Sequence, residues 1–365
     1  MKHIFVSVFC LLVSLPLFQM LTHVISEVPF HENRKIAEFP PYRKIEEFNL
    51  FLKDFDLYFK DNFGMRSYLV KLELSLNYFL FQETPMKDVL IGEEGWLYYD
   101  PIKNDGITME DFYGNVNYTP EKLKLIQTKL HNLNEFLKLK KIRFIFFITP
   151  NKNSIYPEYL PTNINSKKAS YTRYDQIMDI LFKEGIETIN LKSIFIEKKD
   201  QEKNNMYYKT DSHWNHLGAY FGYKSLFDKL NIQSKEYTFL ETYHPGGDLA
   251  GMLSIDYLMY EKDYKSSTDI LSQSDCNPIY SKDSFYCETN ENSKRLVMYR
   301  DSFSIWLVPY VKQHFSRSVY LWGTANLDLN LIEKEKADIV IIQMVERHLD
   351  NLLILYQDEL LENLK

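Results

Sequence analysis

Three short segments, at residues 142–148, 295–299 and 338–344, are apolar over most of their length. Such runs are typical of strands that are covered on both faces of a parallel sheet. Amphipathic helical patterns alternate with the predicted strands, and the clearest runs from Pro120 to Leu137, just before the first of these segments. Alternating strands and helices predict an α/β domain, with a mainly parallel central sheet between two layers of helices. In such sheets, sites form beyond the carboxyl ends of the strands.

Weaker patterns predict the remaining elements. Thr119 is a good N-cap for the helix that begins at Pro120, and Asn215 is a plausible cap for a helix from His216 to Leu230. We also expect helices over 44–82, 172–184 and 303–314, two strands between Val89 and Tyr99, and strands over 187–191 and 318–322.

The N-terminus begins with Lys2 and His3, followed by an apolar run from Ile4 to Met20. The run has no polar face, which argues against a buried helix of a soluble domain. It is typical of a signal peptide or a signal anchor, and no small-residue cleavage site follows it, so we favour an uncleaved anchor. A Pro-containing stretch up to residue 43 then predicts a tether leaving the membrane.

The length limits the number of domains, and the net charge limits the class of partner. A chain of 365 residues can form one large domain or two ordinary ones. We divide it into a signal anchor or signal peptide at 1–24, a tether at 25–43, and one domain at 44–365 that carries an N-terminal helical and hairpin elaboration. The net charge of -7 gives no reason to expect a nucleic-acid partner, because phosphate binding needs a basic surface.

Three cysteines bear on the compartment. Cys10 lies inside the apolar run, whereas Cys276 and Cys287 lie close together in a polar stretch. In an exported protein such a pair can form a disulfide, and two free thiols are the alternative. Metal binding is disfavoured because two thiolates without a neighbouring His or Cys do not complete a tetrahedral site.

Ser302 follows the apolar strand 295–299 and precedes a predicted helix. A serine in this turn could act as a nucleophile, because the free N–H groups of the helix end could stabilise an oxyanion. From this pattern alone, the commoner interpretation is that Ser302 or Asp301 caps the helix.

A second group of polar residues lies at 210–215. If this segment is extended, Asp211 and His213 project to the same side, and the carboxylate can orient the imidazole as a general base. Two alternatives remain. One is a structural Asp–His hydrogen bond, and the other is a metal site made from Asp211, His213, His216 and His244.

The blocks Thr210–Asn215 (TDSHWN) and Arg300–Phe303 (RDSF) together resemble the D-x-H-W-N and D-S-F motifs of the alginate O-acetyltransferase family, which is SGNH hydrolase-like and includes DHHW-type proteins. The resemblance spans roughly residues 32–348. Shorter blocks that carry it are Glu32-Asn33-Arg34, Asp61–Arg66, Gly92–Tyr98, Thr149–Pro161, Gly247-Asp248-Leu249 and Val345-Glu346-Arg347.

This resemblance implies an SGNH-like three-layer α/β/α fold and a catalytic triad of Ser302, His213 and Asp211, with no metal and no cofactor. The oxyanion donors of ordinary SGNH hydrolases have no clear counterpart, since Arg300 stands where those hydrolases have glycine. The Ser302 N–H is one candidate donor. Further candidates for oxyanion or substrate binding are Arg300, Trp214 and Asp248, although Asp248 could simply cap a glycine turn.

The resemblance also implies an activity: transfer of acetyl groups to hydroxyls of an exported or cell-surface polysaccharide through an acetyl-serine. It implies a membrane-bound acyltransferase as the acetyl donor, and an inner-membrane anchor that holds the catalytic domain in the periplasm or outside the cell. An acetyl esterase acting on glycans, or a silent scaffold of an export complex, would be compatible with the same residues.

Overall fold

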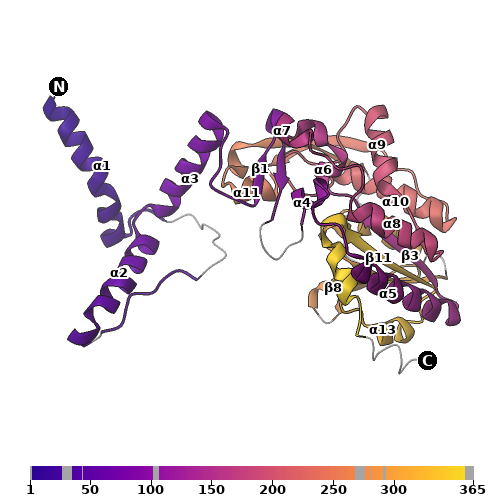
Figure 1. Cartoon of the computed structure of the whole chain (residues 1–365). Helices are drawn as coiled ribbons and strands as arrows, with labels where there is room; N and C mark the ends of the chain where they lie inside the picture. Colours follow the sequence, from indigo (N-terminus) through magenta and orange to yellow (C-terminus); the bar gives the residue numbers. More distant parts are fainter. Residues whose placement is uncertain are drawn as a thin grey trace. The chain divides into compact units, whose positions relative to one another are not determined.

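A computed structural model of the chain describes residues 2–26, 35–42, 44–101, 107–267, 276–279, 281–290 and 293–357 (Figure 1). Much of the predicted tether, including Pro29 and the Glu32-Asn33-Arg34 block, lies outside these residues. Two compact units make up the chain. The first is Met1–Pro85 with Leu253–Ile255, and the second is Met86–Met252 with Asp256–Lys365.

The second unit is built on a seven-stranded sheet with the order β4-β3-β11-β9-β10-β8-β7. The first five of these strands are parallel neighbours, and β8 and β7 are added antiparallel at one edge. The strands are β4 (Glu187–Thr188), β3 (Arg143–Thr149), β11 (Ile339–Val345), β9 (Arg295–Arg300), β10 (Arg317–Trp322), β8 (Ser281–Glu288) and β7 (Cys276–Ile279).

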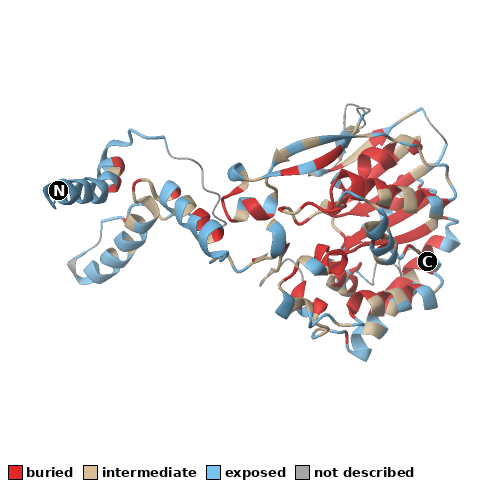
Figure 2. Cartoon of the chain, turned by 90° about the horizontal axis from the view of Figure 1, so that it is seen from above, coloured by how far each residue is buried: buried red, intermediate tan, exposed pale blue. Residues whose placement is uncertain are grey.

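Helices cover both faces of this sheet, because the central strands carry apolar side chains on both sides. In β3, Ile145 and Phe147 pack in one core while Phe146 and Ile148 pack in the other. Figure 2 shows the buried residues gathered on the strands and on the adjoining helices. The first core includes α9 (Leu191–Gln201), α10 (His216–Leu230) and α12 (Val308–Val311), and the second includes α5 (Pro120–Leu139), α8 (Arg173–Lys183) and α13 (Leu329–Lys334). The predicted three-layer α/β/α architecture is confirmed.

The helix ends follow the predicted capping chemistry. The Thr119 side chain accepts from the Lys122 amide at the start of α5, and Asn215 accepts from Gly218 at the start of α10. The predicted hairpin is also present, as the antiparallel pair β1 (Val89–Ile91) and β2 (Leu97–Tyr99).

Two helix predictions differ from the structure. The stretch 303–314 is not one helix, but a 3-10 turn (Ser302–Ile305), the short α12 and a second 3-10 turn (Lys312–His314). Pro309 lacks an N–H and interrupts regular hydrogen bonding there. The stretch 44–82 is divided at Gly64 and Met65 into α2 (Phe48–Asn62) and α3 (Arg66–Leu76), which continues as a π-helix to Phe81.

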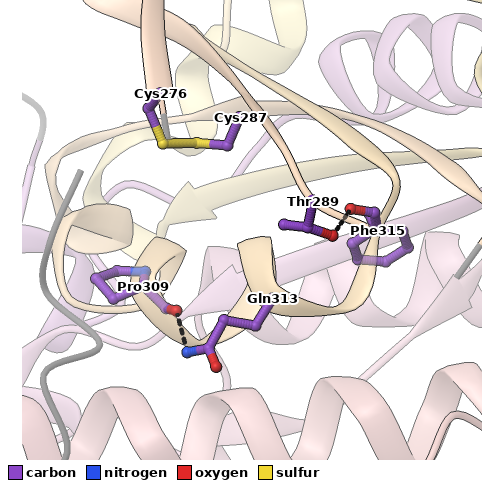
Figure 3. The surroundings of a disulfide bond; sticks show 6 residues. All are labelled: Cys276, Cys287, Thr289, Pro309, Gln313 and Phe315. Atoms are coloured by element: carbon purple, nitrogen blue, oxygen red, sulfur yellow. Dashed lines mark hydrogen bonds between the residues drawn. A yellow bond between two sulfur atoms is a disulfide. The ribbon is translucent and has the colours of Figure 1, made fainter. Parts of the chain in front are cut away.

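The polar stretch after α10 contains strands that the sequence did not reveal. β5 (Phe239–Pro245) and β6 (Tyr260–Ser266) form an antiparallel pair that is separate from the seven-stranded sheet. At the sheet edge, Cys276 of β7 and Cys287 of β8 are directly paired and joined by a disulfide (Figure 3). The bond matches the disulfide alternative and suggests an extracytoplasmic location, because such bonds persist in oxidising compartments.

The first unit begins with α1 (Lys2–Thr22), an apolar helix of 21 residues with a mean hydropathy of 2.3 in its most apolar window. Among the described residues, it is the one helix long and apolar enough to cross a membrane. It is consistent with a signal sequence or an anchor, as the sequence predicted.

Candidate active site

Ser302 lies where β9 ends and the 3-10 turn begins. The capping role in this turn belongs to Asp301, whose side chain accepts from the Phe303 amide at 3.0 Å. The same buried carboxylate accepts from the Val345 amide at 2.6 Å and from the Gln343 side chain at 2.9 Å. Asp301 therefore ties the turn to β11, and the Ser302 hydroxyl points to a different partner.

That partner is His213. Its Nε2 atom lies 2.8 Å from Ser302 Oγ, and its Nδ1 atom lies 2.7 Å from Asp211 Oδ1. The three predicted residues thus form one continuous hydrogen-bonded chain from carboxylate to hydroxyl. The side chains of His213 and Asp211 are each about one-fifth exposed, so a substrate can reach these hydrogen-bonded residues from solvent.

The extended conformation that would place Asp211 and His213 on the same side is not what brings them together. Residues 209–213 form bends rather than an extended strand, so side-chain alternation does not bring the pair together. Instead, the backbone turns so that Asp211 Oδ1 accepts from the His213 amide at 2.8 Å as well as contacting its ring. This local Asx-type turn fixes the carboxylate relative to the imidazole.

Electrostatics favour a charged Asp211. Burial raises the pKa of Asp211, but the hydrogen bond and charge of His213 outweigh this effect and hold the pKa well below its ordinary value. Partial burial and the charge of Asp211 raise the pKa of the neighbouring Asp248. The environment therefore shifts the pKa values of the two carboxylates in opposite directions, and His213 favours the ionised form of Asp211.

A metal alternative can be compared with this arrangement. Within the described residues, Asp211, His213 and Asp248 bring three ligand atoms within 4.8 Å of one another. However, these carboxylate oxygens already accept hydrogen bonds from amide and hydroxyl groups. His216, which the metal alternative included, instead directs Nδ1 to Asp263 at 2.7 Å. The donor set is thus better described as a hydrogen-bonded network.

Trp214 and Arg300 contact the segments that carry His213 and Ser302. Trp214 is fully buried, and its indole N–H donates to the Phe303 carbonyl at 2.8 Å. This bond joins the His213 segment to the Ser302 turn. The Arg300 guanidinium donates to the Asp283 carbonyl at 2.6 Å and packs over the Trp322 ring. Neither side chain is among those that line the cavity at Ser302.

Asp248 begins α11 (Asp248–Met252) and does line that cavity. Its two oxygens accept from the amide and the hydroxyl of Ser212, both at 2.6 Å, and its own amide donates to Asp211 Oδ2 at 3.0 Å. Asp248 Oδ2 also lies 3.5 Å from His213 Nδ1. The Gly247-Asp248 turn therefore supports the Asp211 segment from outside.

Sequence reasoning missed a buried lysine that holds this segment from inside. Lys152 Nζ donates to the carbonyls of Tyr208, Lys209 and Asp211, at 3.1, 3.0 and 2.7 Å. Burial lowers the pKa of Lys152 to about 8, so the donating ammonium form still predominates at pH 7. Its position in the sequence could have pointed to Lys152, because it follows the carboxyl end of β3 and ligand sites of parallel sheets form beyond these strand ends.

Glu261 of β6 was missed for a different reason. Its carboxylate accepts from the amides of Lys209 and Thr210 and from the Thr210 hydroxyl. β6 lies in the stretch whose strands the sequence did not reveal, so no pattern pointed to a buried glutamate there.

A cavity of about 390 Å³ opens at Ser302. This volume is within the range of roughly 300–1,000 Å³ that is typical of small-ligand sites. Besides Ser302, His213, Asp211 and Asp248, its lining combines aromatic and polar side chains: Tyr208, His216, His244, Asp263, Lys265 and Trp306. The cavity offers hydrogen-bonding groups together with apolar ring surfaces.

Replacing Gly247 with alanine is expected to lower kcat by roughly 100-fold, because a displacement of about 1 Å in a catalytic group can have that effect. A methyl group at residue 247 would lie only 2.3 Å from Asp211 Cβ and 2.5 Å from its Oδ2. The matched control is Gly251→Ala in α11, the helix that follows Gly247, where a methyl group meets no atom within 4 Å. Equal catalytic rates for the two variants would show that the Asp211 position does not limit activity.

Comparison with known proteins identifies the family of the chain. Residues 89–321, more than half of the chain, match the family model described as the SGNH hydrolase-like domain of acetyltransferase AlgX. A comparison with curated proteins gave no match.

Among solved structures, the O-acetyltransferase domain of Pseudomonas putida AlgJ is similar over 76% of this chain and 98% of its own, at 15% identity and a TM-score of 0.47. Bacillus cereus PatB1 is similar over 73% and 99%, at 17% identity and a TM-score of 0.49. A DHHW family protein from Eubacterium siraeum is similar over 75% and 98%, at 17% identity and a TM-score of 0.48. Because the family model matches more than half of the chain, the chain belongs to the SGNH hydrolase-like acetyltransferase family of AlgX.

Proposed function

We propose that this protein transfers acetyl groups to hydroxyls of an exported or cell-surface polysaccharide, through an acetyl-serine at Ser302. The observation that carries the proposal is the unbroken chain of contacts from Asp211 through His213 to the Ser302 hydroxyl, within a family of acetyltransferases. No cofactor is needed, because an activated serine supplies the chemistry.

In the first step, Ser302 Oγ attacks the carbonyl carbon of an acetyl donor while His213 Nε2 accepts the hydroxyl proton. Asp211 holds the Nδ1–H of His213 and stabilises the imidazolium that forms. The tetrahedral intermediate then collapses, and the donor's leaving group departs with the proton from His213. Ser302 is left as an acetyl ester and His213 is neutral again.

In the second step, an acceptor hydroxyl attacks the acetyl-serine. His213 removes the proton from the attacking hydroxyl and returns it to Ser302 Oγ as the ester bond breaks. The cavity supports a sugar acceptor, because its aromatic rings, Tyr208 and Trp306, offer apolar faces beside polar groups.

The oxyanion donor follows from the local hydrogen bonds. Gln343 accepts from the Asp301 amide at 3.1 Å, and Asp301 accepts from the Phe303 amide. Neither side chain engages the Ser302 amide between them, so we assign this N–H as an oxyanion donor. The Arg300 head group is held against Asp283 and Trp322, which favours a supporting role behind the turn.

The N-terminal helix and the disulfide support the proposed location. An uncleaved α1 would anchor the chain in the inner membrane, with the sheet domain in the periplasm or outside the cell. A cytoplasmic acetyl donor cannot diffuse across the bilayer, so we propose that a membrane-bound acyltransferase supplies the acetyl group to Ser302.

The test is intact mass spectrometry of the full chain in detergent, after incubation with an activated acetyl ester, with and without oligosaccharide. We expect an acetyl adduct whose loss is accelerated by oligosaccharide, together with acetylated sugar. Release to water alone would instead assign an esterase. An unmodified and folded protein in every arm would contradict catalysis by this triad and favour a scaffold role.

A further inference from the structure

The first unit exposes apolar side chains on helices other than α1. α2 has no buried residue, although phenylalanines recur along one of its faces. Phe48, Phe51, Phe55 and Phe59 follow one another with ring centroids 6.1 to 6.5 Å apart. Phe48 is 56% exposed and Phe55 is 36% exposed. Phe51 and Phe59 are partly exposed. A row of apolar side chains that reaches the surface in this way is typical of a protein or membrane interaction site.

α3 carries a second stripe. Leu69, Leu72, Leu76 and Leu80 recur at helical spacing, so they share one face of α3 and its π-helical continuation. All four are exposed, from 42% at Leu69 to 66% at Leu80. We call α2 and α3, with the π-helix to Phe81, the apolar helix pair.

The turn between the two helices packs against α1. A methyl group at Gly64 would lie 2.0 Å from the Pro16 carbonyl oxygen and 2.6 Å from the Met20 amide nitrogen. Glycine is therefore needed for this close approach of two backbones. The Tyr68 hydroxyl also donates to the Ser26 carbonyl, just after α1. The apolar helix pair thus has a defined position along α1, beside its last two turns.

This position sets the depth of the pair if α1 spans a bilayer. At 1.5 Å per residue, the 21 residues of α1 are about 30 Å long, close to the hydrocarbon thickness. With Lys2 on the cytoplasmic side, as the positive-inside rule favours, residues 16–20 reach the outer boundary of the hydrocarbon. The pair's corner, at Gly64, then lies at the same level.

We infer that the apolar helix pair lies in the outer interface of the bilayer, with the Phe48–Phe59 stripe and the Leu69–Leu80 stripe turned to the lipid. The inference rests on the anchor role of α1 within the proposed function. Amphipathic helices bind such interfaces through one apolar face and keep their charges in water. α2 fits this pattern, since Lys53 lies on the face opposite Phe55 and is exposed.

A bilayer is favoured over a protein partner because the structure already brings the pair against the helix that enters the membrane. The chain would then continue from Phe81 at the membrane surface, and not from the end of a flexible tether. The apolar helix pair would therefore keep the domain that carries Ser302 close to a membrane-bound donor.

Spin labelling of the full chain in vesicles of phosphatidylethanolamine and phosphatidylglycerol tests the inference. Cys10 is replaced by serine, and single cysteines are introduced by Phe55→Cys, Leu72→Cys, Lys53→Cys and Val13→Cys. Nitroxide collision rates with oxygen, which concentrates in lipid, and with a polar nickel complex, which is excluded from it, report depth. We expect the oxygen-to-nickel ratio to shift upward at Phe55 and Leu72, to be highest at Val13, and to have the aqueous value at Lys53.

The Val13 label separates the possible failures. A lipid-exposed Val13 with aqueous values at both Phe55 and Leu72 would overturn the inference and keep the anchor. Aqueous values at Val13 would overturn the anchor and the inference together. Labels at Phe55 and Leu72 shielded from both reagents would indicate protein contact and overturn the inference in favour of a protein partner. The acetyl adduct at Ser302 is measured separately and does not depend on these outcomes.

Discussion

Replacing Asp211 with asparagine is expected to lower kcat by about 10⁴-fold, the loss typical when a triad carboxylate becomes an amide. Both oxygens of Asp211 accept hydrogen bonds: Oδ1 from the His213 amide and ring, and Oδ2 from the Asp248 amide. Either orientation of the asparagine amide places an NH₂ group against one set of these donors. If the NH₂ group faces His213, it donates to Nδ1 and holds the ring in the tautomer whose Nε2 carries the proton, so Nε2 cannot accept the Ser302 proton. If the NH₂ group faces the Asp248 amide, His213 keeps an oxygen acceptor but loses the negative charge that stabilises its imidazolium form.

The control for this experiment is Asp248→Asn, measured in the same acetyl-transfer assay. The asparagine Oδ1 can still accept from the Ser212 amide, and the Ser212 hydroxyl can rotate to accept from the new NH₂ group. We therefore expect a loss within about tenfold for this variant, well short of the loss expected at a triad carboxylate. If Asp248→Asn were the more damaging change, Asp248 rather than Asp211 would be the carboxylate that supports His213.

Replacing Asp301 with alanine is expected to lower the free energy of unfolding by about 2–4 kcal/mol, since it removes a buried charge acceptor from several donors. The Val345 amide and the Gln343 side chain would each lose a buried hydrogen-bond acceptor at the carboxyl end of the sheet. The Ser302 turn would also lose its cap. Denaturant unfolding followed by circular dichroism measures the change.

Asp328→Ala is the matched control, because Asp328 caps α13 through the Asn330 and Leu331 amides but is exposed. A cap of this kind contributes about 1 kcal/mol. Equal losses in the two variants would show that Asp301 acts only as a helix cap and that its bonds to β11 contribute nothing further.

The acid side of the stability curve follows from the same carboxylate. Burial raises the pKa of Asp301, but the contact with His348 and the bonds from Gln343 and Val345 outweigh it and lower the pKa below 3.8. Because the pKa of Asp301 is lowered in the folded state, its carboxylate stabilises the fold at pH values above its ordinary pKa, and this stabilisation is lost as the pH falls through the lowered pKa. The Asp301→Ala variant should therefore lose less stability on acidification than the native chain.

The fold was predictable where the core determines the pattern. The buried strands β3, β9 and β11 are apolar on both faces, and the long helices α5 and α10 carry their own caps, so local sequence contains their signal. β5 and β6 contain many polar residues and pair with each other, which leaves no comparable apolar run. The stretch 303–314 was predicted as one helix, but Pro309 has no N–H to donate, and the stretch is divided into short turns.

The candidate site was predictable in its motifs but not in its supports. Ser302, His213 and Asp211 could be named from two short blocks, and the structure brings their side chains together. Lys152 and Glu261 come from distant segments and act on backbone groups of the 208–211 loop. Contacts between a side chain and a remote backbone have no sequence period, which is why such supports require the fold.

The central claim is that Ser302 carries the acetyl group. The most direct test is peptide mapping of the full chain by mass spectrometry after brief exposure to an activated acetyl ester, beside Ser302→Ala and His213→Ala variants. On this proposal, we expect an acetyl group on the peptide that contains Ser302, absent in Ser302→Ala and strongly reduced in His213→Ala. An adduct that persists in Ser302→Ala, or that forms equally in His213→Ala, would contradict it.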